Sequence, residues 1–179
     1  MPGPLHCRRV RPRQLRRFVH TPVLPGRREL DFADGARFAK GIVMACWLVK
    51  EEPDHYSFDD LQRDGTTLWE GVSNNLARKY LRQMKPGDRL LYYHTGKEKA
   101  VVGEAVAVSE ALRDPGGDSK GVAVQVKAIR RWPAAVTLKR IKADPGLQDW
   151  ELVRLPRLSV MPVSAAQWRR VEQLAREPG

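Results

Sequence analysis

The stretch RLLYYHTGKEKAVVGEAVAVSEAL, residues 89–112, contains two apolar runs separated by the short polar turn GKEK. Runs rich in Val, Leu and Tyr on either side of a glycine-containing turn are typical of a β-hairpin. A third run, VAVQVKAI at 122–129, follows after the loop DPGGDSKG at 114–121. Three successive strands joined by short connections predict an antiparallel sheet.

Upstream of this hairpin the sequence predicts a strand followed by a short helix. CWLV at 46–49 reads as a buried strand, which must end before Pro53 because proline lacks a backbone donor. Ser57 is expected to cap a helix over FDDLQRD at 58–64, and Gly65 is a suitable stop.

A second strand and helix come next. The segment 66–74, TTLWEGVSN, is expected to run as a strand and turn through Gly71. The helix NLARKYLRQM at 75–84 then has Ser73 or Asn74 as its cap, and its apolar residues fall on one face.

Downstream of the hairpin the pattern returns to short helices and a final strand. Segment 136–152 is expected to contain one or two short helices, and RLSVMPVS at 157–164 the last strand. Ser164 and Gln167 form a capping box for a C-terminal helix over 165–179. The sequence therefore predicts an α+β domain with a strongly curved or closed sheet of five or six strands.

The net charge of +11 is unevenly distributed. Residues 1–43 carry ten Lys and Arg against three acids, a net of +7, whereas residues 44–179 have a net of only +4. Position matters more than the sum for electrostatic binding. A protein that coats DNA mainly through charge is therefore not indicated.

The basic leader of residues 1–43 is rich in Arg and Pro and has no acid before Glu29. Three interpretations compete: a disordered arm that contacts nucleic acid, an organellar transit segment, and upstream sequence joined to a protein that begins at Met44. We favour the third, because Met44 lies just before the first convincing strand, which begins at Cys46. The predicted domain is then 44–179.

Several classes of site are disfavoured by composition. Two cysteines, Cys7 and Cys46, cannot form a disulfide framework or a cysteine-based zinc site. The four histidines are scattered, so we expect no metal and no cofactor. No apolar run reaches the eighteen residues of a membrane span, so we expect no membrane partner.

Catalysis has weak support. A hydrolytic site would use His94 or His55 as base and Ser57, Ser73 or Ser159 as nucleophile, but no GxSxG elbow or similar motif positions them. His94 follows two tyrosines in a strand, where a histidine with a structural role is the more common case. We therefore expect a protein that is not an enzyme.

Binding of a planar ligand has better support. Aromatic rings can stack on a base, and amide side chains can read its donors and acceptors. Residues of these kinds lie at strand ends or strand-to-helix junctions, namely Trp47, Trp69, Tyr92, Tyr93, Asn74, Asn75 and Ser159. The same tryptophans could equally fill the core, and the asparagines could cap a helix.

These segments resemble the EVE domain family, over about Cys46 to Glu172. WLVKEEPDHYSFDDL is similar to the family's opening W-L-x-K-S-E-P-x-x-Y-S segment, and TLWEGVSNNLARKYLRQMKPGD to its W-D/E-G-V-x-N-x-x-A-R core. LLYYHT is similar to its F-Y-H-S strand, and RLSVMPVS to its R-L-S-V-x-P-V segment. Several motifs in the same order make the resemblance specific.

The resemblance implies a PUA-like curved β-barrel of five to six strands, with flanking short helices and a C-terminal helix, related to the YTH readers of methylated RNA. It implies a non-catalytic reader that holds a modified base, often a modified cytosine, in an aromatic-lined pocket. The positions that match the segments at or beside that pocket are Trp47, Lys50, Glu51, Trp69, Gly71, Val72, Asn74, Tyr93, His94, Arg157, Leu158 and Ser159.

The expected partner is thus modified DNA or RNA, bound with weak to moderate affinity. The alternatives are an enzyme that processes nucleotides or nucleic acid through His94, and a structural interaction module with a vestigial pocket. We expect a bacterial-type protein to be cytoplasmic and a eukaryotic one nuclear or organellar, and the oligomeric state is left open. One departure from the family is clear: Glu51 stands where a serine is usual.

Overall fold

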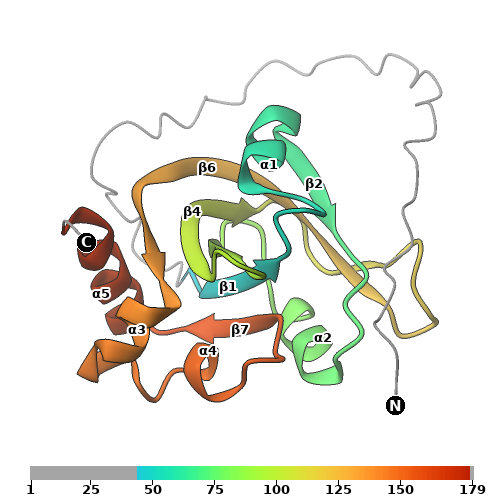
Figure 1. Ribbon diagram of the computed structural model, residues 1–179. Coiled ribbons are helices and arrows are strands. Elements are labelled where there is room, and N and C mark those ends of the chain that lie inside the picture. Colours follow the sequence, from blue (N-terminus) through green and yellow to red (C-terminus); the bar gives the residue numbers. More distant parts are fainter. Residues whose placement is uncertain (1–43, 178–179) are drawn as a thin grey trace. The chain divides into compact units, whose positions relative to one another are not determined.

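The computed structural model describes residues 44–177 (Figure 1). The predicted leader, residues 1–43, lies outside the described residues. The elements are β1 (Cys46–Glu51), α1 (Phe58–Asp64), β2 (Thr66–Trp69), α2 (Asn75–Leu81), β3 (Arg89–His94), β4 (Ala100–Ala107), β5 (Leu112–Arg113), β6 (Val122–Thr137), α3 (Leu138–Ala143), the 3-10 helix η1 (Pro145–Leu147), α4 (Glu151–Arg154), β7 (Val160–Val163) and α5 (Ala165–Arg176).

All these strands belong to one mixed sheet, in the order β2-β6-β4-β3-β1-β7, with β5 paired to β6. The predicted hairpin is confirmed, since β3 pairs antiparallel with β4, and β4 in turn with β6. The exception to the antiparallel pattern is β1, which runs parallel to β3 and antiparallel to β7. This places β1 between two strands that come from distant parts of the chain.

The sheet differs from the predicted barrel in strand number and in closure. It has seven strands rather than five or six, because the loop after β4 returns as the two-residue strand β5 against β6. Within residues 44–177, no ladder of backbone hydrogen bonds joins β2 to β7, so the sheet is open in its pairing. It is nevertheless strongly curved: Figure 1 shows β6 arching over β4 and β1.

Strand β6 is also longer than the sequence indicates, since it continues through Trp132 and Pro133 to Thr137. Pro133 lies between the pairs Gly103–Arg131 and Val101–Val136, where the register with β4 shifts. A proline in a strand is tolerated at such an irregularity because its missing N–H is not needed there. The hydrophobic pattern alone gives no sign of this bulge.

The local signals for helices are confirmed. Ser57 and Asp60 form a capping box at the start of α1, and Gly65 ends that helix with a φ of 76°. Asn74 caps α2, which stops at Leu81, three residues before the predicted end. Helix α5 begins with the predicted capping box of Ser164 and Gln167.

Helix α1 packs closely on the sheet at a glycine. Phe58, the first residue of α1, is fully buried, and a Cβ atom on Gly103 of β4 would lie only 2.5 Å from Phe58 Cζ. A glycine within a strand commonly marks such a close approach. The segment that follows β1 is therefore held directly against β4.

An ion cluster around the buried Glu104 joins the sheet to α5. Glu104 of β4 is 5% exposed, and its two carboxylate oxygens contact Arg89 Nη2 at 2.6 Å and Arg130 Nε at 3.1 Å. Arg130 also reaches Glu172 of α5 at 2.9 Å, and the Arg89 guanidinium lies 4.2 Å from the ring centroid of Trp168. Charge and stacking thus hold α5 to strands β3, β4 and β6.

Among the described residues, none of the helices has the length and apolar character needed to cross a membrane.

Candidate functional site

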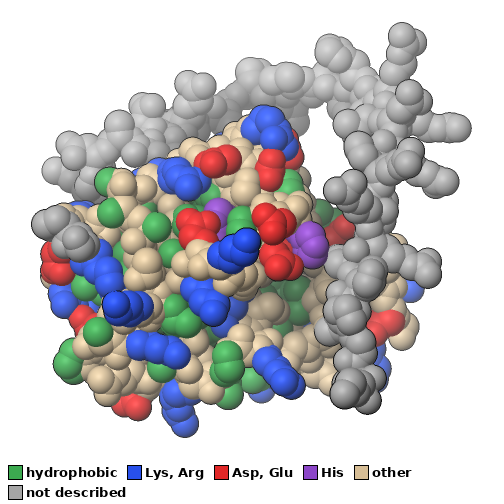
Figure 2. All heavy atoms as spheres, in the orientation of Figure 1, with side chains coloured by type: hydrophobic (Ala, Val, Ile, Leu, Met, Phe, Trp, Pro, Cys, Tyr) green, Lys and Arg blue, Asp and Glu red, His purple; other side chains and the backbone are tan. Residues whose placement is uncertain are grey.

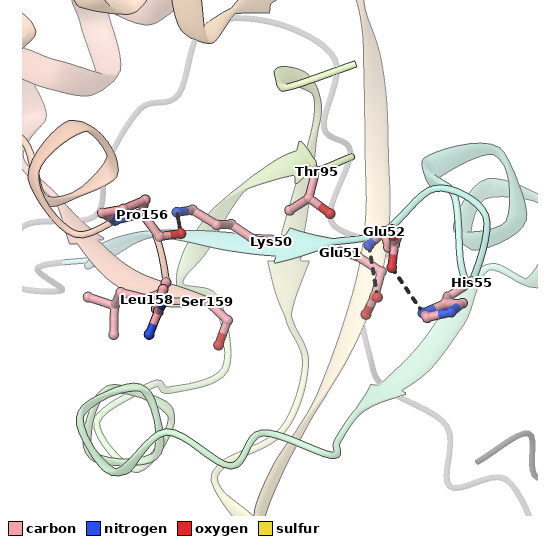
Figure 3. Close-up of a pocket in the computed structure, with 9 residues that line it drawn as sticks. Lys50, Glu51, Glu52, His55, Thr95, Pro156, Leu158 and Ser159 are labelled. Carbon is pink, nitrogen blue, oxygen red and sulfur yellow. Dashed lines mark hydrogen bonds and ion pairs between the residues drawn. The ribbon is translucent and has the colours of Figure 1, made fainter. Parts of the chain in front are cut away.

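A cavity of about 230 Å³ lies where β1 ends (Figure 3). Its walls come from the end of β1 and the turn after it, from the end of β3, and from the segment that leads into β7. The lining residues are Lys50, Glu51, Glu52, His55, Thr95, Pro156, Arg157, Leu158 and Ser159.

The pairing of β1 with both neighbours brings these segments together. The N–H of Lys50 donates to the Ser159 carbonyl at 2.9 Å, which aligns β1 with the start of β7. The N–H of Thr95 donates to the Glu51 carbonyl at 2.8 Å, which aligns β1 with the end of β3. Pro53 then turns the chain away and leaves an opening at the strand ends.

Lys50 spans one side of this opening. Its Nζ donates to the Pro156 carbonyl at 3.2 Å and lies 5.7 Å from the ring centroid of Tyr93. Burial lowers the pKa of the Lys50 ammonium to about 8. The side chain therefore holds the segment before β7 to β1, while its charge is less stabilised than that of an exposed lysine.

Glu51 extends to the other side of β1. Its Oε1 accepts a hydrogen bond from the Glu52 N–H at 2.9 Å. Burial raises the pKa of the Glu51 carboxyl, against the opposing effect of that N–H. The neighbouring Glu52 makes a separate contact, with its Oε2 3.7 Å from His55 Nδ1.

The cavity wall thus carries both signs of charge. Glu51 and Glu52 lie at the end of β1, and the Lys50 side chain reaches the Pro156 carbonyl in the segment before β7. Arg157 belongs to that segment and also lines the cavity. Arg157 is exposed and makes no hydrogen bond or ion pair within residues 44–177. Figure 2 shows acidic and histidine side chains next to Lys and Arg side chains on this face.

The predicted aromatic residues lie in the core rather than on the cavity wall. Trp47 Nε1 donates to Asp88 Oδ2 at 2.9 Å. Trp69 is 5% exposed and meets Tyr92 edge to face, with 5.4 Å between ring centroids. Tyr93 is buried as well. The only planar side-chain ring among the lining residues is the imidazole of His55.

The predicted residues of the β2–α2 connection also lie outside the cavity lining, and their contacts are structural. Asn74 Oδ1 accepts from the N–H groups of Leu76 and Ala77 as the helix cap. Gly71 has a φ of 73°, and its N–H donates to Asp114 Oδ2 at 2.8 Å. Val72 is buried.

His94 has both ring nitrogens engaged. It is 2% exposed, Nε2 accepts from the Phe58 N–H at 3.0 Å, and Nδ1 lies 2.6 Å from Glu98 Oε2. Because Nε2 accepts, the hydrogen must be on Nδ1, which donates to Glu98. His94 therefore joins α1 to the β3–β4 turn, and it does not line the cavity.

The roles predicted for the site residues stay predictions. Five of these residues line the cavity, namely Lys50, Glu51, Arg157, Leu158 and Ser159. Four lining residues are not among the predicted pocket positions: Glu52, His55, Thr95 and Pro156. Thr95 could have been found because it ends the strand LLYYHT, beside β1. Pro156 has no such signal, since its contribution is a backbone carbonyl.

Within the part of the chain that the structure describes, no group of three or more His, Cys, Asp or Glu side chains could hold a metal ion.

Fold and cavity together define a curved, mixed-sheet α+β domain with an open site of mixed charge at the end of β1, the strand that pairs parallel with β3. The family model of the EVE domain matches residues 45–174. The chain belongs to the EVE domain family.

Relatives and solved structures agree with this assignment. Thymocyte nuclear protein 1 of Gallus gallus is 33% identical over 171 residues, which cover 76% of this chain and 71% of that protein. An NMR structure of a Rhodopseudomonas palustris protein is 39% identical, with a TM-score of 0.71 over 74% of this chain and 94% of that one. Human THYN1 protein, solved in complex with DNA that contains 5-methylcytosine, is 26% identical, with a TM-score of 0.71 over 76% of this chain and 100% of that one.

Proposed function

We propose that this protein is a non-catalytic reader of nucleic acid, which holds one modified base, such as a modified cytosine, in the cavity at the end of β1. The observation that carries the proposal is the similarity of the whole described domain to human THYN1 protein, whose structure contains DNA with 5-methylcytosine. The polymer is DNA or RNA, bound with weak to moderate affinity.

The size of the cavity supports a single base as the occupant. Its volume of about 230 Å³ is below the roughly 300–1,000 Å³ of common small-molecule pockets. A base that leaves a stack, or one that is already single-stranded, can enter such a site if the contacts recover an unstacking cost of a few kcal/mol. The opening at the strand ends gives it a route.

The distribution of charge supports a nucleotide. A nucleotide carries a phosphate anion at one end and a base with hydrogen-bond donors and acceptors at the other. The exposed Arg157, in the segment before β7, is one of the lining residues. The carboxylates of Glu51 and Glu52 lie at the end of β1. Arginine is well suited to a phosphate because its planar fork can donate two hydrogen bonds.

Stacking in this cavity would come from different groups than the resemblance implies. Bases stack on histidine rings and arginine guanidinium planes as well as on Phe, Tyr and Trp. His55 and Arg157 are the planar groups on the wall. The stacking role of Trp69 stays a prediction, and an aromatic-lined pocket would require the buried Trp69 and Tyr93 rings to become accessible.

The test is fluorescence anisotropy with labelled oligonucleotides that are identical except at one position. That position carries cytosine, 5-methylcytosine, 5-hydroxymethylcytosine, adenine or N6-methyladenine, in single-stranded and duplex form and in DNA and RNA. We expect at least one modified oligonucleotide to bind about tenfold more tightly than its unmodified partner, a difference typical of apolar contact with one added group.

Two charge-reversal variants test whether the oligonucleotide binds at the cavity. Arg157→Glu should weaken this binding by about tenfold or more, because it replaces a phosphate-facing cation with an anion. Arg169→Glu is the matched control, since Arg169 is exposed on α5 and outside the cavity lining. Equal binding of modified and unmodified oligonucleotides, or equal loss in the two variants, would overturn the proposal.

A further inference from the structure

We propose that Glu51 makes this cavity selective for bases that carry an exocyclic amino group, of the cytosine and adenine type, over bases that carry a carbonyl at the same position. The inference rests on the proposed function and names the class of ligand that the same site takes. It comes from the contacts of the Glu51 carboxylate, which leave one of its two oxygens without a partner among the described residues.

The Glu51 carboxylate has an unused acceptor in the cavity wall. Its Oε1 accepts from the Glu52 N–H at 2.9 Å, whereas Oε2 has no hydrogen-bond or ion-pair partner within residues 44–177. An ionised carboxylate offers about four acceptor positions and no donor. One hydrogen bond from its own neighbour therefore leaves most of its capacity free for a ligand.

The nearby cations do not use this capacity. Lys50 donates to the Pro156 carbonyl, and Figure 3 shows it on the opposite side of β1 from the Glu51 carboxylate. His55 contacts Glu52 rather than Glu51. Arg157 makes no ion pair with any described residue. A half-buried carboxylate without a cation is costly unless something else donates to it.

A comparison of 5-methylcytosine with thymine isolates the effect of the exocyclic amino group. 5-Methylcytosine and thymine have the same ring and the same C5 methyl group, so shape and apolar contact are nearly equal. They differ in that cytosine has an amino donor on C4, where thymine has the O4 acceptor. A carboxylate accepts from the amino group, as Asp and Glu do from cytosine N4, and repels the carbonyl oxygen.

Ser159 is a second hydrogen-bonding side chain in the cavity lining, and it does not discriminate between the two bases. Figure 3 shows its hydroxyl and the Glu51 carboxylate on the same side of β1. A hydroxyl can donate or accept, so it satisfies the N3 acceptor of cytosine or the N3–H of thymine equally. Ser159 therefore tolerates both bases, and the discrimination falls on Glu51.

The experiment compares one oligonucleotide with 5-methylcytosine, cytosine, thymine or uracil at the same single-stranded position, by fluorescence anisotropy. The wild-type protein should bind the 5-methylcytosine form about tenfold or more tightly than the thymine form, as expected for one hydrogen bond to a charged group. Cytosine should be preferred over uracil in the same direction, because that pair differs at the same atom.

Glu51→Gln should reduce the 5-methylcytosine to thymine ratio to within about threefold. The amide keeps the shape of the side chain, but when its oxygen accepts from the Glu52 N–H its NH₂ group faces the cavity as a donor. Glu52→Gln is the matched control, because it removes one negative charge from the same wall and leaves Glu51 in place. It should keep the wild-type ratio.

The outcomes separate this inference from the function on which it rests. If modified oligonucleotides bind but thymine binds as well as 5-methylcytosine, the inference is wrong and the reader function stands. If Glu51→Gln keeps the ratio, or Glu52→Gln lowers it equally, Glu51 is not the selective group. If none of the oligonucleotides binds, the proposed function itself fails, and the inference fails with it.

Discussion

Two acidic residues on different strands of the sheet, Glu104 of β4 and Glu51 of β1, show how the same functional group is used in opposite ways. Glu104 is 5% exposed, and both of its oxygens contact an arginine, one from Arg89 and one from Arg130. Glu51 is half-buried and receives one backbone N–H on a single oxygen. Both oxygens of the Glu104 carboxylate have partners within the protein, whereas one oxygen of the Glu51 carboxylate has no partner among the described residues.

The difference separates structural charge from charge that is available to a ligand. A buried ion that is fully paired holds elements in place, and loss of one partner leaves the other uncompensated. A partly buried ion with free acceptor positions keeps a cost that a ligand can relieve. On this criterion Glu104 organises α5 and the sheet, and Glu51 is the carboxylate available to the ligand that we propose.

The largest expected effect concerns Trp69, which the resemblance places at the pocket and the structure places in the core. Trp69→Ala should lower the free energy of unfolding by about 3–5 kcal/mol, because it removes a buried ring that packs edge to face on Tyr92. Urea denaturation measures this, and Trp69→Phe should cost less. Unchanged stability with lost binding would instead place the ring in the site.

Glu104→Gln should come next, with a loss of about 3 kcal/mol in the free energy of unfolding. The amide cannot compensate the charge of Arg89, which then remains partly buried without a counterion, and Arg130 keeps only its ion pair with Glu172. Glu172→Gln is a suitable comparison in the same cluster, because it leaves Glu104 to pair with both arginines. If the two variants lost equal stability, the buried carboxylate would have no special role.

Arg157→Ala should have a smaller effect, and on binding alone. Removal of one phosphate contact should weaken all bound oligonucleotides by a similar factor of a few, and should reduce the slope of log K against log salt by about 1. The free energy of unfolding should not change, because Arg157 is exposed and has no partner among the described residues. A change in base preference without a change in slope would place Arg157 on the base instead.

Glu51→Gln should change the free energy of unfolding by less than about 1 kcal/mol, with a sign that depends on pH. The raised pKa of Glu51 means that the folded state binds its proton more tightly than the unfolded state. The wild type should therefore lose stability as pH rises from the ordinary glutamate range through the raised pKa. The glutamine variant lacks this loss, so it should gain relative to the wild type over that window.

Burial is the main cause that raises the pKa of Glu51, and the Glu52 carboxylate adds to it, whereas the Glu52 N–H, His55 and His94 lower it. Urea denaturation of both proteins at several pH values across the acid range measures the difference. If the wild type gained stability relative to Glu51→Gln as pH rose through this range, the Glu51 carboxylate would have a partner that satisfies its charge.

The sequence alone determined the parts of this protein that depend on neighbouring residues. The boundaries of α1 follow from Ser57, Asp60 and Gly65, because capping and chain reversal act within one helical turn. The antiparallel β3–β4–β6 unit follows from alternating apolar runs and short turns. The order of several motifs was enough to identify the family.

The tertiary structure decided which of the candidate side chains meet. Trp47, Trp69 and His94 have residue types that suit a binding site, but each has its polar atoms or ring faces occupied by the core. Conversely, Pro156 lines the cavity only because the parallel β1–β3 pair and the antiparallel β1–β7 pair bring positions more than one hundred residues apart beside Lys50. Pairing over that separation depends on the packing of the whole sheet, which no local sequence pattern encodes. The same packing leaves one oxygen of Glu51 without a hydrogen-bond partner among the described residues.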